Sequence, residues 1–474
     1  MALPLPLTAF EEYILLDGTP AHPMQFFYRL RFDGPIDPGQ LRAAAAAALE
    51  RHPLLAARIE RRHGHRPRFA ARAAEPGGSD CVLPLDVEPG DDLPAIPPLD
   101  ERTGPLVRLV RVGPTDEAGL HDVIAQFHHV ACDGLGALAF LADLLEILDA
   151  RLTGRPASLD ALEPRLLSRR GRYGLDSWHL LASLPSQARG LEGVWKFMRH
   201  RPVRIAAPPG TAGLESRPEI LAARSVTFTA DEAAALRKHA SRSGVSLNEL
   251  AAAALLEALA PAVPAAALSE PRSVIRLSIP INMRQAADRR VPAANIVSMV
   301  FLDRGAAQIA AAARLPGSLH DEMHLIKRLG LGMTFLFTLA AARCSAGGIA
   351  SLVRNQSTAA TALFTNLGRV FRRHDRRAGR RTAARRSAHL QVGDARLERV
   401  EGLAPLRRGT TIAVAATEYA GTLCFTLRHD PMAVTTAAAA RIGDDFATRL
   451  RCRLDTLLDA SAAEADEPLL EAVR

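Results

Sequence analysis

Two adjacent histidines, followed by an aspartate and a glycine, form the densest group of reactive side chains in the sequence. The segment 128–134 reads HHVACDG and contains His128, His129, Asp133 and Gly134. Because the pKa of histidine lies near neutrality, either ring can take a proton from an alcohol, a thiol or an amine. A nearby aspartate can fix an imidazole or a loop. Gly134 permits a backbone turn that a Cβ would block.

Three roles compete for this segment. Two histidines, Cys132 and Asp133 could ligate a metal, but adjacent histidines point in different directions and no other cluster completes a ligand set, so we expect no metal. The histidines and the aspartate could instead only satisfy buried hydrogen bonds. The third role is general-base catalysis, which suits a loop held by a rigid strand.

The elements around the segment predict two similar α/β parts. Residues 123–127 form a short apolar run that predicts a strand, and 136–152 have helical spacing. Residues 73–104 are rich in Pro, Gly and Asp and predict a loop. We expect a first part at 1–165, a linker at 166–222 and a second part at 223–474. A cleft between two such parts is a common place for a ligand site.

Further elements are expected on both sides of the linker. They comprise strands at 25–32, 106–112, 224–229, 273–281, 297–303, 362–366, 411–417 and 423–428 and helices at 37–50, 231–240, 246–260, 320–342 and 435–457. In the 246–260 helix, Ser246 and Glu249 have the spacing of a capping box. Within the linker, residues 173–199 form an amphipathic stretch that includes Trp178, Trp195 and Met198.

The composition is that of a globular protein, with 48% hydrophobic and 23% charged residues among 474. The net charge is +8, but only three of the 59 basic residues are lysines, so much of the charge reflects a bias toward arginine. Five scattered cysteines, without a C-x-x-C pair, argue against a disulfide framework. The N-terminal residues have no basic and apolar pattern of a secretory signal, so we expect a cytoplasmic protein.

Several segments together resemble the CoA-dependent acyltransferase superfamily. This superfamily includes condensation domains of peptide synthetases, chloramphenicol acetyltransferase-like enzymes, wax ester synthases and polyketide-associated acyltransferases. The HHVACDG segment resembles its H-H-x-x-x-D-G signature. Other matching segments, in the same order, are RHPLLAARI at 51–59, SLNELAAAALLEALA at 246–260, IPINMR at 279–284 followed by Asn295, and TNLG at 365–368. Glu249, Ala294 and Thr365 replace the usual Asp, Gly and Ser.

The resemblance implies a mixed α/β (α+β) fold of two chloramphenicol-acetyltransferase-like halves, with mixed sheets flanked by helices and an active-site tunnel between them. It implies that His129 is the general base, that Asp133 is a structural residue paired with Arg284, and that Gly134 offers a backbone N–H to an oxyanion. Asn366 would lie near the thioester arm, although Asn-x-Gly is also ordinary turn chemistry.

The resemblance also leaves His128 a supporting role and makes Cys132 a small buried residue. It implies an acyl-CoA or a phosphopantetheine thioester as co-substrate, with no tightly bound cofactor. The leading activity is acyl transfer to the hydroxyl of a small acceptor. A free-standing condensation enzyme that forms an amide and a non-catalytic carrier-binding module are alternatives.

Nine arginines between Arg369 and Arg386 concentrate the positive charge. Because no nucleic-acid-binding module surrounds them, we expect no nucleic-acid partner. A solvated surface loop, a contact to CoA phosphates or an acidic carrier protein, and a peripheral membrane contact aided by the amphipathic stretch remain the candidate roles.

Overall fold

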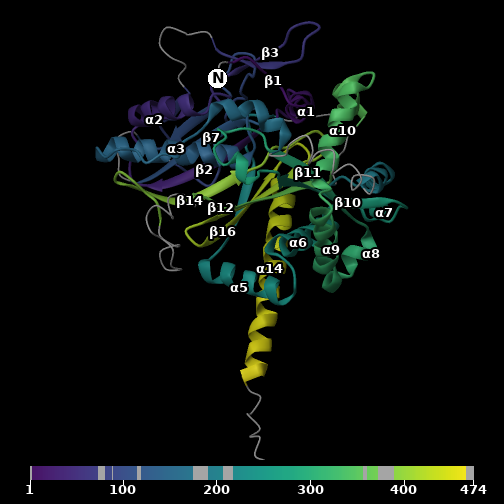
Figure 1. Cartoon of the computed structure of the whole chain (residues 1–474). Helices are drawn as coiled ribbons and strands as arrows, with labels where there is room; N and C mark the ends of the chain where they lie inside the picture. Colours follow the sequence, from purple (N-terminus) through teal and green to yellow (C-terminus); the bar gives the residue numbers. More distant parts are fainter. Residues whose placement is uncertain are drawn as a thin grey trace, which may run out of the picture.

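The chain folds into two mixed β-sheets flanked by helices (Figure 1). The structure is a computed structural model. It describes residues 3–72, 81–87, 89–114, 119–173, 190–205, 217–355, 360–371 and 389–465. The mixed α/β fold class predicted from the sequence is confirmed.

The first sheet contains strands from both ends of the chain. Its order is β13 (Gln391–Val392), β14 (Ala395–Leu403), β2 (Gln25–Asp33), β7 (Leu120–His128), β6 (Val107–Val112) and β5 (Val82–Leu85). Only the β5–β6 pair is parallel. The aromatic residues of β2 are buried on both faces of the strand, as expected for a central strand covered by other layers.

Two helices pack on this sheet and lie side by side in Figure 1. Helix α2 (Pro38–Arg51) begins after Asp37, whose carboxylate accepts a hydrogen bond from the backbone of Gln40. Helix α3 (Gly134–Thr153) begins directly after Asp133 and ends at Gly154, which has a φ of 71°. This φ lies in the left-handed region, where glycine carries no Cβ penalty.

The second sheet has the order β11 (Val297–Arg304), β10 (Ser273–Asn282), β12 (Ala362–Arg369), β15 (Ile412–Tyr419), β16 (Thr422–His429) and β9 (Ala223–Phe228), with β8 (Arg201–Pro202) on β10. Strand β12 pairs in parallel with β10 and β15. Strand β14 lies against β15, so the two sheets meet at this point.

The helices of the second part pack against its sheet and against each other. They are α5 (Ala230–Arg242), α6 (Leu247–Leu259), α7 (Ala265–Leu268), α8 (Ala306–Ala310), α9 (Leu315–Arg328), α10 (Gly332–Cys344), α11 (Gly348–Asn355) and α14 (Thr436–Ala465). The capping box predicted for α6 is present, with Ser246 and Glu249 bonded to each other's backbone. The single helix predicted at 320–342 is two helices, because the chain turns at Gly330, whose φ is 64°.

The remaining elements of the described ranges are one helix, a small third sheet and four 3-10 segments. They are α1 (Ala9–Asp17), the small sheet of β1 (Leu5–Pro6), β4 (Arg68–Ala70) and β3 (Arg58–Glu60), and the 3-10 segments η1 (Pro164–Arg172), η2 (Ala260–Ala262), η3 (Ala286–Asp288) and η4 (Ala312–Arg314). Helix α1 has its own capping box, formed by Thr8 and Glu11.

Two expectations need correction. The predicted loop at 73–104 contains strand β5, an edge strand that tolerates Pro84 because it pairs on one side only. Residues 391–403 belong by sequence to the second part but pair with the first sheet. The division of the chain into parts that end at 165 and begin at 223 stays a prediction. The second part, however, contributes β13 and β14 to the first sheet.

The amphipathic stretch is described only at its C-terminal end. Residues 190–199 are helical there, and Leu191, Trp195 and Met198 are strongly exposed. Trp178 lies outside the described residues, and so does the basic run beyond Phe371. Within the described ranges, no single helix is long and apolar enough to cross a membrane, although two bent helix pairs pass this test by length and composition.

Candidate active site

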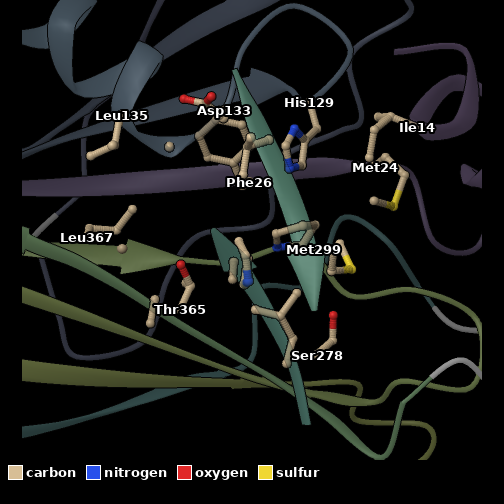
Figure 2. A pocket seen from close by; sticks show the side chains of 18 of the residues that line it. Ile14, Met24, Phe26, His129, Asp133, Leu135, Ser278, Met299, Thr365 and Leu367 are labelled. Atoms are coloured by element: carbon tan, nitrogen blue, oxygen red, sulfur yellow. The ribbon is translucent and has the colours of Figure 1, made fainter. Parts of the chain in front are cut away.

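A cavity lies between the two sheets, where the two-part fold predicts one. It encloses about 1100 Å³, including its open mouth. Its walls come from α1 and β2, the loop after β7, strands β10, β11 and β12, and residues 402–410. Most of the lining side chains are apolar, and Figure 2 shows Ile14, Met24, Phe26, Met299 and Leu367 around it. Such a lining suits an apolar ligand with a few polar anchor points.

His129 lines this cavity and follows directly after the end of β7. Its backbone N–H donates to the carbonyl of Met24 over 2.8 Å, and its own carbonyl accepts from Nδ2 of Asn295 over 2.9 Å. The imidazole stands edge-on to the rings of Phe26 and Phe10, with centroids 5.2 and 6.3 Å away. Figure 2 shows the ring pointing into the cavity.

The surroundings of His129 keep its imidazole neutral. Burial lowers its pKa below the ordinary 6.5, because removal from water disfavours the charged form. Neighbouring backbone oxygens and the charge of Asp133 oppose this effect only in part. A neutral imidazole that faces an apolar cavity can accept a proton at neutral pH.

The carboxylate of Asp133 holds the loop that follows His129. Its Oδ1 accepts from the backbone N–H of Gly136, which makes Asp133 the N-cap of α3. Its Oδ2 accepts from Nη1 of Arg284 and from the backbone N–H of Ile296, each over 2.8 Å. Nη2 of Arg284 donates to the carbonyl of Ala294. The ion pair that the resemblance implies is therefore present, and it joins the two parts of the chain.

The structure gives a different reason for glycine at position 134 from the one predicted. Its φ does not lie in the left-handed region, so no turn demands glycine there. A Cβ at this position would lie 2.6 Å from Cδ2 of Leu367 and 3.1 Å from the hydroxyl of Tyr28. That hydroxyl donates to the carbonyl of Gly134. As the first residue of α3, Gly134 has a backbone N–H without an intrahelical partner, which leaves it available to an anion.

His128 and Cys132 are buried and do not line the cavity. Burial lowers the pKa of His128 to about 3, and its Nδ1 accepts from the backbone N–H of Val130. Burial also raises the pKa of Cys132 well above its ordinary value, so its thiol stays protonated. Both residues support the loop by packing. The described residues contain no group of three or more His, Cys, Asp or Glu that could hold a metal.

Asn366 combines both roles considered for it. It lies on β12 and lines the cavity, and its Oδ1 accepts from the backbone N–H of Gly368 over 2.7 Å. Its Nδ2 donates to Oδ1 of Asn248, in the segment that starts α6. The side chain is exposed, so a ligand that enters from this side can reach it.

Sequence reasoning missed the residues that hold the His129 loop in place. Nδ2 of Asn295 donates to the carbonyls of both His129 and Val130. Nδ1 of His52 accepts from the backbone N–H of Ala293 over 2.9 Å, which fixes the same segment from the first part. Both residues belong to segments that resemble the superfamily, but that resemblance does not say which groups His52 and Asn295 bind.

No protein-family model matches the sequence, and no curated protein matches it either. Solved structures do match. The first condensation domain of the CDA synthetase aligns with a TM-score of 0.65 at 15% identity, covering 96% of this chain and 97% of that one. The starter condensation domain of the rhizomide synthetase RzmA, solved in complex with C8-CoA, aligns with a TM-score of 0.60 at 14% identity, covering 95% of each chain.

Polyketide synthase associated protein 5 from Mycobacterium tuberculosis aligns with a TM-score of 0.59 at 16% identity, covering 94% of this chain and 98% of that one. These likenesses extend over nearly the whole chain and define a condensation-domain fold. The chain therefore has the fold of these proteins, in agreement with the fold expected from its motifs.

Proposed function

We propose that this protein is an acyltransferase that moves an acyl group from a thioester to a hydroxyl acceptor. One observation carries the proposal: the neutral imidazole of His129 faces an apolar cavity beside the N-terminus of α3. A general base and an anion-stabilising group therefore lie on one wall. Acyl transfer from a thioester needs both, because a proton leaves the acceptor while charge develops on the carbonyl oxygen.

In the proposed reaction, His129 takes the proton of the acceptor hydroxyl as its oxygen attacks the thioester carbonyl. The carbonyl oxygen becomes an oxyanion, which the N-terminus of α3 at Gly134 stabilises. The C–S bond then breaks, the ester forms, and the imidazolium returns the proton to the departing thiolate. A positioned base of this kind contributes about 10²–10⁴-fold to the rate.

No covalent acyl-enzyme is required by this arrangement. The thiol of Cys132 is buried and protonated, so it is a poor nucleophile. Ser298, which lines the cavity, donates its hydroxyl to the carbonyl of Gly332. Direct transfer from donor to acceptor is the simplest path that uses the groups present.

The donor is proposed to be an acyl-CoA or an acyl group on a phosphopantetheine arm of a carrier protein. The apolar walls of the cavity favour an aliphatic acyl chain. The complex of the RzmA starter condensation domain with C8-CoA, a protein of the same fold, supports this choice of donor. Asn366, which lines the cavity and is exposed on β12, would meet the arm.

Amide formation is the second candidate, because condensation domains share this fold. The same imidazole would take the proton of an amine. The two reactions are separated by a thiol-release assay with octanoyl-CoA against a panel of alcohols and amines, with mass spectrometry of the products. We expect esters. Amides alone would favour the condensation enzyme, and CoA binding without thiol release from any acceptor would favour a non-catalytic module.

We further propose that helix 190–199 makes a peripheral membrane contact. Leu191, Trp195 and Met198 recur at i, i+4 and i+7, so they share one exposed face. Arg199 stacks on the ring of Trp195, and Arg201 is exposed close by in the chain. Exposed aromatic and apolar side chains beside cations fit an anionic lipid surface.

A further inference from the structure

A buried ion pair at the end of α1 forms part of the mostly apolar cavity wall. Nη2 of Arg407 donates to Oδ1 of Asp17 over 2.7 Å, and each residue is only 7% exposed. Both residues line the cavity that contains His129. Asp17 ends α1, and Arg407 lies in the loop before β15, so the pair joins opposite ends of the chain.

The pairing of these two side chains is incomplete. Oδ2 of Asp17 and Nε of Arg407 are buried without a hydrogen-bond partner among the described residues. An incompletely paired buried ion pair is costly, and an apolar pair of similar volume would often be at least as stable. Stability alone therefore does not account for two charged residues in this wall.

Helix α1 sets the distance between the ion pair and the base. Phe10, Tyr13, Ile14 and Asp17 all line the cavity, which the i, i+3, i+4, i+7 spacing of one helix face explains. Phe10 contacts the ring of His129. Seven residues at 1.5 Å each place Asp17 about 10 Å along the helix from Phe10. A ligand with its reacting atom at His129 would therefore reach the pair with a group about 10 Å away.

The position of α1 assigns the pair to the acceptor side. In Figure 2, Ile14 of α1 lies on one side of His129, whereas Thr365 and Leu367 lie on the other. Asn366, proposed above to meet the thioester arm, lies between those two residues on β12. The acceptor would then approach His129 from the side of α1.

The unused atoms define the chemistry that the pair can bind. Together the two residues are electrically neutral, and they leave one acceptor oxygen and one donor N–H. We propose that Asp17 and Arg407 form a subsite for a neutral end group of the acceptor that both donates and accepts, such as a primary carboxamide. A charged end group would have to compete with the existing ion pair. This inference rests on the proposed acyl transfer to a hydroxyl group.

The test compares two acceptors that differ only at the far end, with octanoyl-CoA as donor. 8-Hydroxyoctanamide carries a carboxamide, and octan-1-ol carries none. We expect the wild-type protein to favour the amide in kcat/KM by at least about tenfold, because a site with unpaired polar groups rejects an analogue that leaves them unpaired. In the double variant Asp17→Leu/Arg407→Met the ratio of the two values should fall to about one.

A matched control removes a second buried ion pair on the same helix. Glu11 pairs with Arg170 over 2.7 Å, both are buried, and neither lines the cavity. Because Glu11 also closes the capping box of α1, it is replaced by glutamine, which keeps that bond. The variant Glu11→Gln/Arg170→Met should keep the acceptor ratio of the wild type. A wild-type ratio near one, or a preference for the amide that survives in the Asp17→Leu/Arg407→Met variant, would overturn the subsite.

Binding separates the failure of the subsite from the failure of the transfer reaction. If the wild type acylates neither alcohol, calorimetric titration with the same two compounds still reports on the subsite. Tighter binding of the amide, lost in the Asp17→Leu/Arg407→Met variant, would retain the subsite and reject transfer to these hydroxyls. Equal affinities would reject the subsite. Tighter binding of 8-hydroxyoctanoate than of the amide would reject a neutral end group.

Discussion

Removal of the Asp133 carboxylate tests how the catalytic loop is held. In Asp133→Ala, α3 loses its N-cap, which costs about 1 kcal/mol, and the N–H of Ile296 loses its acceptor, which costs about 1–3 kcal/mol. Arg284 loses its partner too, but its side chain is 21% exposed and water partly replaces the carboxylate. We therefore expect a loss of about 3–5 kcal/mol, as for other broken buried pairs.

Chemical denaturation followed by circular dichroism measures this loss of stability. Thiol release from octanoyl-CoA measures the loss of turnover that a displaced His129 loop would cause. Asp444→Ala is the matched control, because Asp444 pairs with Arg224 at the surface and its loss should cost below about 1 kcal/mol. Asp133→Asn keeps one carbonyl acceptor, so its loss of stability should lie between those of Asp133→Ala and Asp444→Ala. An Asp133→Ala protein with wild-type stability and turnover would refute the assignment of Asp133 as the residue that fixes the loop.

Three further predictions concern the base, the helix start and the exposed helix. Burial lowers the pKa of His129 below 6.5. The fall of kcat/KM toward acid pH, where the imidazole becomes protonated, should therefore have its midpoint below pH 6.5. A midpoint above pH 6.5 would contradict the burial argument. Gly134→Ala should lower kcat by about ten- to a hundredfold. The second substitution Leu367→Ala should restore part of this kcat, because the new Cβ meets the side chain of Leu367. An unchanged kcat in Gly134→Ala would refute the close-packing role of Gly134. Trp195→Ala/Met198→Ala should reduce sedimentation with phosphatidylglycerol vesicles and have no effect with phosphatidylcholine, whereas unchanged sedimentation would exclude this face as the membrane contact.

Local signals made parts of the fold predictable from the sequence. Helix α6 was predicted together with its capping box, because Ser246 and Glu249 bond to each other's backbone across only three residues of sequence. Strand β14 was not predicted, because it contains charged residues that a buried strand usually lacks. Glu401 on β14 is nevertheless buried, opposite Arg29 of β2, which lies near the other end of the sequence. Such a partner is invisible until the sheet has formed.

The same limit applies to the site. The Asp133–Arg284 pair was expected from the resemblance alone, since no spacing rule links residues that far apart. The roles of His52 and Asn295 escaped prediction because their partners are backbone groups of distant segments. The Asp17–Arg407 pair could not be predicted from the sequence, because neither residue lies in a recognisable motif. The two residues are far apart in the chain, and only the folded structure brings them together at the cavity.

The most direct measurement is thiol release from octanoyl-CoA by His129→Ala, compared with the wild type and with His65→Ala at an exposed histidine. Circular dichroism should show the same fold in all three proteins. We predict that His65→Ala retains turnover and that His129→Ala loses it by about 10²–10⁴-fold. Wild-type turnover in a folded His129→Ala protein would contradict the role of His129 as the general base.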